Sequence, residues 1–125
     1  MRFSIITPSF RQLAWLRLCA ASVADQPSVE HEHIVQDAGT GPELENWAKT
    51  VPKLSLHVEK DDGMYDAVNR GLKRAQGTIC SYLNCDEQLL PNVLGQVAAF
   101  FEKNPEIDVL FGDAIRPSRS EKPWQ

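Results

Sequence analysis

The sequence has no apolar run approaching the roughly 20 residues that a membrane-spanning helix needs, and the apolar run at its N-terminus is too short for a signal peptide. It also lacks a basic excess: 13 Lys and Arg stand against 17 Asp and Glu, for a net charge of −4. Nothing in this balance suggests nucleic-acid binding, which would want a basic stripe. We therefore expect a cytoplasmic protein without a transmembrane span, and we leave open peripheral contact with the inner face of the membrane.

Cysteine is scarce as well. The three thiols, Cys19, Cys80 and Cys85, are odd in number and lack the spacing of a metal site, which indicates free thiols in a reducing compartment. Cys19 falls in a helical pattern and Cys80 in a strand pattern, so we expect both side chains to be buried. The three histidines do not form a zinc-binding set either.

The 125 residues, 42% of them hydrophobic and 24% charged, suit one globular domain with a real core. Strand and helix patterns alternate along the chain. We expect strands over 3–7, 31–37, 54–59, 78–83 and 108–112, and helices over 13–25, 42–49, 64–75 and 93–103. We assign residues 1–115 to this domain and residues 116–125, which are rich in proline, serine and charge, to a flexible tail.

Alternating strands and helices favour an α/β fold, with a mostly parallel sheet and helices on both faces, because parallel strands require right-handed crossovers. In such sheets ligands bind beyond the carboxyl ends of the strands. Polar residues of this sequence gather at those positions: Thr7-Pro8-Ser9, Asp37, Asp61-Asp62, and Asn84 with Asp86-Glu87. Carboxylates in such loops are suited to hold a divalent cation beside a phosphorylated ligand.

These segments resemble the family 2 glycosyltransferases, inverting enzymes with the GT-A nucleotide-sugar fold. The resemblance begins at residues 4–10 and is most specific over 61–71, which read Asp-Asp-Gly-Met-Tyr-Asp-Ala-Val-Asn-Arg-Gly. Residues 82–87, Tyr-Leu-Asn-Cys-Asp-Glu, stand where the family carries its metal-binding acidic motif. The resemblance implies a GT-A (Rossmann-like nucleotide-diphospho-sugar transferase) fold, which we expect to be truncated in this chain.

The resemblance also implies which residues bind the nucleotide and donor sugar. They come from the loops after the strands: Pro8, Ser9, Asp37, Asp62, Gly63 and Asn84. Asp37 would hydrogen-bond the base, and Asp62, ahead of its neighbour Asp61, would face the base and ribose. Read without the family, Asp37 is also a turn former and Asp62 an N-cap of the helix over 64–75. Asp66 and Asn69, three residues apart on that helix, are expected to support the acidic loops.

The same resemblance makes Asp86 a ligand of a magnesium or manganese ion, with Glu87 as its helper. When a sugar–nucleotide bond breaks, negative charge grows on the leaving diphosphate, and a hard cation stabilises that charge. One carboxylate and phosphate oxygens suffice, since magnesium keeps much of its water shell. The motif departs from the family pattern at Glu87, whose side chain is longer than the common aspartate.

In this family the acceptor-binding half and the catalytic carboxylate base lie well beyond the metal motif, whereas this chain ends at Gln125. Asp113, after the expected last strand, is the weak candidate for a base. We also expect the apolar residues 109–111 to lie uncovered and to promote self-association.

Our hypothesis is therefore a glycosyltransferase donor-binding domain. It would bind a nucleotide-diphospho-sugar together with a divalent cation, and the preferred candidate for this donor is a UDP-sugar. The reaction would be inverting transfer of the sugar to a hydroxyl acceptor in polysaccharide or glycolipid synthesis. The alternative is a catalytically incomplete nucleotide-binding fragment or module that needs a missing half or a partner. An unrelated doubly wound binding domain is a third and weaker interpretation.

Overall fold

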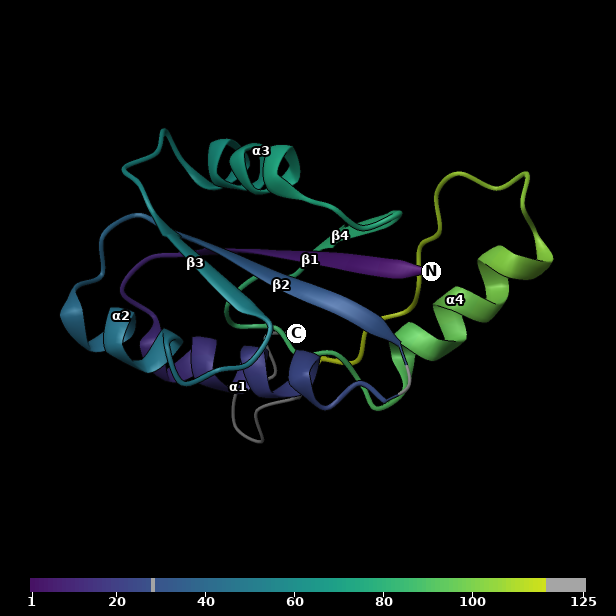
Figure 1. The fold of residues 1–125 in the computed structure, drawn as a ribbon, viewed down its shortest axis with the longest axis horizontal. Coiled ribbons are helices and arrows are strands. Elements are labelled where there is room, and N and C mark those ends of the chain that lie inside the picture. The colour runs from purple at the N-terminus through teal and green to yellow at the C-terminus, as the bar shows by residue number, and fades with distance from the viewer. Residues whose placement is uncertain (28, 117–125) are drawn as a thin grey trace.

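The computed structural model of the chain describes residues 1–27 and 29–116. Strands and helices alternate along these residues (Figure 1). In chain order they are β1 (Arg2–Ser9), α1 (Leu13–Ala24), β2 (Glu30–Asp37), α2 (Pro42–Ala48), β3 (Leu54–Val58), α3 (Met64–Arg74), β4 (Ile79–Tyr82) and α4 (Val93–Lys103). The strands form one sheet in the order β3-β2-β1-β4, and every neighbouring pair is parallel. The predicted parallel α/β architecture is confirmed.

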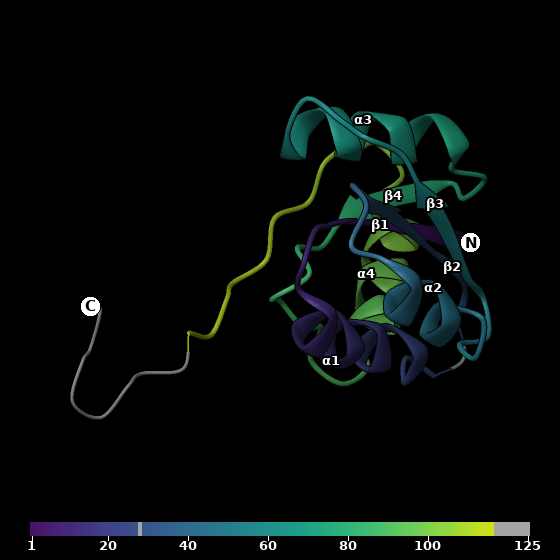
Figure 2. The same cartoon turned by 90° about the vertical axis from the view of Figure 1, so that its left-hand side faces the viewer.

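Helices cover both faces of the sheet, as Figures 1 and 2 show. On one face α3 packs on β1 and β2, and it comes so close that a Cβ added to Gly71 would lie 2.4 Å from Cγ2 of Ile6. On the other face Phe3 and Ile5 of β1 pack against Cys19 of α1 and against α4. Because successive side chains of a strand point to opposite faces, β1 is apolar on both of them and forms the centre of the core.

A second part of the core joins α1, α2 and β2. Leu16, Leu44 and Val35 meet there, all fully buried, with Trp47 packed at the margin. This cluster places α2 on the same face of the sheet as α1. The loop from β2 into α2 is thereby fixed at both ends, which matters below because it carries Asp37.

The first strand is longer than predicted. β1 continues through Pro8 and Ser9, which pair in register with Gln36 and Asp37 of β2. A proline is tolerated there because the backbone of Ile6, two residues earlier, faces β4, and the pairing of β1 with β4 ends at Ile6. The missing N–H of Pro8 therefore points to the side without a neighbouring strand.

The predicted strand over 108–112 is wrong. Within the described residues the sheet ends at β4, and residues 108–112 form an extended but unpaired segment. A strand needs a neighbour to complete its backbone hydrogen bonds, and these residues have none. Val109 and Phe111 are consequently 65% and 88% exposed. The predicted tail lies outside the described residues apart from Arg116.

Cys80 also differs from the prediction: it is exposed, whereas Cys19 is fully buried as expected. The reason is the position of β4 at the end of the sheet, beyond the strands that α3 covers. Other boundaries agree to within one or two residues, and α4 matches its prediction at both ends. None of the helices in the described parts of the chain is long and apolar enough to cross a bilayer.

Candidate functional site

The four parallel strands all deliver their carboxyl ends to one edge of the sheet, the edge that faces the viewer in Figure 2. Ser9 and Asp37 end β1 and β2, and Asp62 and Asp86 lie in the loops that follow β3 and β4. The pKa of the Cys85 thiol is raised first by burial and then by the charges of Asp86 and Asp37. The parallel topology brings the four loops to one edge of the sheet, as predicted, and joint binding of one ligand by their acids stays a prediction.

Asp37 is fully buried, and its carboxylate organises the loop after β2. Its Oδ2 accepts the backbone N–H groups of Gly39 and Thr40 at 2.9 and 2.7 Å, and its Oδ1 accepts the hydroxyl of Thr40 at 2.7 Å. The turn-forming role that the residues alone indicated is thus present. Contact between Asp37 and a nucleotide base stays a prediction. In this structure Asp37 is fully buried, and its carboxylate oxygens accept hydrogen bonds from Gly39 and Thr40.

Thr40 is a site residue that the sequence analysis missed. Its hydroxyl oxygen donates to Asp37 and also accepts the backbone N–H of Arg11 at 2.8 Å, so it joins the loops after β1 and β2. Arg11 adopts a φ of 55° and stacks on the ring of Phe10 at 4.8 Å. The spacing Asp-x-x-Thr would have signalled the first contact, because these side chains often bond locally in turns, but the second spans 29 positions.

The loop after β3 turns sharply into α3 at Gly63, whose φ of 114° suits glycine. Gly63 is the N-cap of α3, without a side-chain capping bond, so the predicted capping by Asp62 is wrong. The helix begins one residue later than an Asp62 cap requires. Asp62 instead donates its backbone N–H to Oδ2 of Asp66 at 2.9 Å, and its exposed side chain lies beside Asp61 at the edge of the site.

The loop after β4 presents two groups with different tasks. Glu87 accepts the backbone N–H of Asn84 through Oε1 at 2.9 Å and so closes the turn, whereas Asp86 is exposed. Oδ1 of Asn84 is buried and has no hydrogen-bond partner, and the same holds for Oγ of Ser9 at the end of β1. Buried polar atoms are nearly always paired with protein or with water, so these two atoms have hydrogen-bonding capacity left for a water molecule or a polar ligand.

Asp86 and Glu87 can hold a divalent cation only if a bound ligand supplies further oxygen atoms to it. Among the described residues, no three His, Cys, Asp or Glu side chains come together as a metal site. Asp86 offers a whole carboxylate, and Glu87 offers the oxygen that does not hold Asn84. Magnesium and manganese sites of this kind use one or two carboxylates, with phosphate oxygens and water completing the shell. The set of oxygens thus fits an ion that arrives with a diphosphate.

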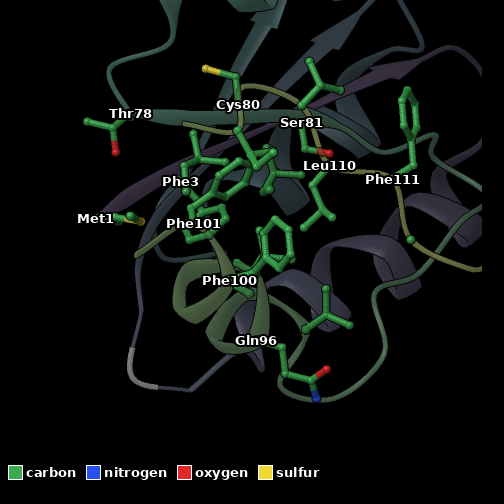
Figure 3. Close-up of a pocket in the computed structure, with 18 of the residues that line it drawn as sticks. Met1, Phe3, Thr78, Cys80, Ser81, Gln96, Phe100, Phe101, Leu110 and Phe111 are labelled. Atoms are coloured by element: carbon green, nitrogen blue, oxygen red, sulfur yellow. The ribbon is translucent and has the colours of Figure 1, made fainter. Parts of the chain in front are cut away.

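Asp113 does not join this site. It lines a groove of about 1030 Å³ between β4, α4 and the segment after α4, together with Phe3, Phe101 and Leu110 (Figure 3). That lining includes none of the residues predicted to bind nucleotide or metal. The structure thus places the weak candidate base on a segment that runs beside β4, and not at the end of a strand of the sheet.

The parallel sheet, its helices and the acid-bearing loops at its carboxyl edge define an α/β domain of the GT-A class. The chain belongs to glycosyl transferase family 2, whose family model matches residues 4–125. The fold class and the family that the sequence resembled are both confirmed.

Named relatives and solved structures agree with this assignment. The chain is 34% identical over 122 residues to a "PGL/p-HBAD biosynthesis glycosyltransferase" of Mycobacterium bovis (strain BCG / Pasteur 1173P2), covering 93% of this chain and 48% of the relative. It is 29% identical to "O-antigen biosynthesis protein RfbC" of Myxococcus xanthus, covering 88% of this chain and 9% of that protein. The chain thus spans about half the length of the mycobacterial relative.

Two solved structures share its fold. S. aureus TarS 1-349 in complex with UDP-GlcNAc superposes with a TM-score of 0.75 at 19% identity, over 98% of this chain and 39% of that one. The mannosyltransferase PcManGT from Pyrobaculum calidifontis, in complex with GDP-Man and Mn²⁺, superposes with a TM-score of 0.69 at 20% identity, over 82% of this chain and 32% of that one. At these identities the likeness concerns the fold alone.

Proposed function

We propose that this chain is the donor-binding part of a glycosyltransferase and binds a nucleotide-diphospho-sugar at the carboxyl edge of its sheet. The preferred candidate for this donor is a UDP-sugar. The observation that carries the proposal is the pair of buried, unpartnered atoms there, Oγ of Ser9 and Oδ1 of Asn84. A buried polar atom costs about 1–3 kcal/mol when neither water nor a ligand group bonds to it. A nucleotide offers both kinds of group, and fold neighbours carry UDP-GlcNAc and GDP-Man.

In this proposal the loops divide the ligand between them. Pro8 and Ser9 line the base side, with Asp37 holding the loop that closes over it. Asp62 and Gly63, at the exposed start of α3, face the ribose. Asn84, whose Oδ1 has no hydrogen-bond partner, would lie near the ribose and diphosphate.

A divalent cation belongs to the same proposal, and Asp86 with Glu87 would hold it. When bound, a magnesium or manganese ion supplies charge stabilisation for the leaving diphosphate. The chain's own contribution is to orient the donor and keep its diphosphate next to Asp86. A PcManGT structure that contains Mn²⁺ supports the use of such an ion on this fold.

The full reaction we propose is inverting transfer of the sugar to a hydroxyl acceptor, in polysaccharide or glycolipid synthesis. It needs a base that deprotonates the acceptor, and Asp113 lines the groove beside β4, whose lining contains none of the predicted donor residues. The alternative proposal is that the chain by itself binds donor but turns over little or nothing. Single-turnover assays with UDP-sugars would contradict this if they showed efficient transfer or hydrolysis.

Isothermal titration of the full chain with UDP tests the binding proposal. We expect UDP to bind in the presence of Mn²⁺ and the affinity to fall at least tenfold with chelator or in Asp86→Asn, since one carboxylate anchors the ion. Asp108→Asn is the matched control, because Asp108 is an exposed aspartate in the segment after α4. Absence of binding at millimolar UDP contradicts the proposal, and equal metal dependence in Asp86→Asn removes Asp86 from the metal site.

We also propose that the protein self-associates and that it is located in the cytoplasm. If its acceptor is lipid-linked, the location would be the inner face of the membrane. Exposure of Val109 and Phe111 supports the first. The exposed free thiol of Cys80 supports a reducing compartment. Light scattering over a range of concentrations tests self-association, and a constant monomer mass contradicts it.

A further inference from the structure

We infer that Asp66 and Arg70 of α3 are positioning residues for this site: with Glu59 they clamp both ends of the loop 59–63, which carries Asp62. The inference rests on the proposed function, because it explains how the acids after β3 are held where a nucleotide would meet them.

The first end of the loop is held at Glu59. Its backbone N–H donates to the carbonyl of Asp37 at 2.9 Å, which continues the contact between β3 and β2 past the last strand residue. Its carboxylate accepts Nε2 of Gln36 at 3.2 Å, Nη1 of Arg74 at 2.8 Å and Nη1 of Arg70 at 3.3 Å. Glu59 is therefore tied to the sheet and to α3 together.

The second end of the loop is held at Asp66. Its Oδ2 accepts the backbone N–H of Asp62 at 2.9 Å, and the same oxygen accepts Nε of Arg70 at 3.1 Å. Between the two ends, the N–H of Gly63 donates to Oδ1 of Asp61 at 3.0 Å. Arg70 thus bridges Glu59, which begins the loop, and Asp66 of α3, which holds its second end, with one guanidinium in contact with both carboxylates.

The charges of this clamp are present at neutral pH. The pKa of Asp66 is lowered, chiefly because its carboxylate accepts a hydrogen bond from the Asp62 N–H, and Arg70 lowers it further. Asp66 therefore stays a carboxylate. The pKa of Glu59 is lowered as well, first by its hydrogen bond from Gln36 and then by Arg74. The side chain of Asp62 lies on the exposed side of the loop, so the clamp grips its backbone and leaves the carboxylate for a ligand.

The clamp is separate from the packing that keeps α3 on the sheet. That packing comes from the buried residues Ala67 and Gly71, whereas Asp66, Arg70 and Glu59 are each about one-third exposed. Ion pairs with this exposure contribute little to global stability. Their removal should therefore release the loop and leave the fold in place.

Titration of the full chain with UDP and Mn²⁺, compared between variants, tests the inference. Asp66→Ala removes the acceptor, and we expect UDP affinity to fall about tenfold because the loop then samples open positions. Asp66→Asn keeps an oxygen for the Asp62 N–H and should recover part of the loss. Glu43→Ala, which breaks the exposed Arg17–Glu43 pair on the other face of the sheet, is the control and should bind UDP like the wild type.

A second measurement separates positioning from general loosening. In ¹H–¹⁵N spectra of the ligand-free protein, the Asp62 amide should shift upfield and exchange faster in Asp66→Ala, with amides of β1 unchanged. If Asp66→Ala does not fold, Asp66→Asn and Arg70→Met test the same contact, and Arg70→Met should weaken UDP binding about as much as Asp66→Ala was expected to.

The outcomes are distinct. Equal UDP affinity in the wild type and the clamp variants overturns the inference and leaves the proposed function standing. A loss of affinity without any change at the Asp62 amide also overturns it, since the residue then acts by another route. A wild-type chain that binds no UDP overturns the proposed function and this inference with it.

Discussion

Acidification should destabilise this protein through one buried histidine. His33, on β2, is 3% exposed, and its Nε2 lies 2.7 Å from Oγ1 of Thr7 on β1. Burial lowers the pKa of His33 from 6.5 to about 4, and the charge of His31 adds to the effect. At neutral pH the native state therefore holds a neutral imidazole inside the core between the sheet and α1.

The sign and size of the effect follow from the two pKa values. Because the unfolded chain binds the proton near pH 6.5 and the native state only near pH 4, the free energy of unfolding is at its full value above pH 6.5. It falls as the pH drops through 6.5 and levels off below the native pKa. The loss from this one group is about 1 kcal/mol between pH 7.5 and 5.5, and about 3 kcal/mol in total.

Urea unfolding followed by circular dichroism at pH 7.5, 6.5 and 5.5 measures this. The matched variant is His33→Gln, which keeps a polar group for Thr7 but cannot titrate. His57, whose pKa is also lowered, chiefly by burial, is present in both proteins and cancels in the comparison. The wild type should lose about 1 kcal/mol more than His33→Gln over this range. Parallel losses in the two proteins would refute the argument that His33 is neutral and buried.

Three further predictions come from single contacts. Gly71→Ala should lower the free energy of unfolding in urea by about 1–3 kcal/mol, because its Cβ would lie 2.4 Å from Ile6; an unchanged midpoint contradicts the close helix–sheet contact. Cys80 should react with Ellman's reagent at once, whereas Cys19, whose pKa burial raises to about 11, should react only on unfolding; fast labelling of Cys19 contradicts its burial. Asp37→Ala removes the acceptor of three hydrogen bonds and should weaken UDP binding in calorimetry at least tenfold. Equal UDP affinity in this variant and the wild type would show that Asp37 has no role in the site.

Much of the fold could be predicted because its signals are local. The alternation of Leu54, Leu56 and Val58 with polar residues predicted β3, and the apolar stripe after Pro91 predicted α4 with both ends correct. The segment 108–112 has the same strand-forming composition, yet it is unpaired. Composition states what a segment is able to form, whereas a strand also requires a partner, and partners are a property of the assembled sheet.

The site divides in the same way. Asp37, Asp62 and Asp86 were predicted from their positions after strand patterns, and the parallel sheet brings their loops to one edge. The capping role of Asp62 was wrong, because the helix begins at Met64 as predicted and the N-cap position directly before it is Gly63. Thr40 was missed because half of its function is a contact with Arg11, far away in sequence.

By itself, then, the amino-acid sequence determined the type and order of the elements and the family to which the chain belongs, since periodicity and motifs are read over neighbouring residues. Only the tertiary structure decided that Oγ of Ser9 and Oδ1 of Asn84 are buried without partners, that Asp113 lines a groove beside β4, and that Arg70 joins two carboxylates across a loop. These facts depend on which distant segments meet, and that is settled when burial of the shared core brings the strands together.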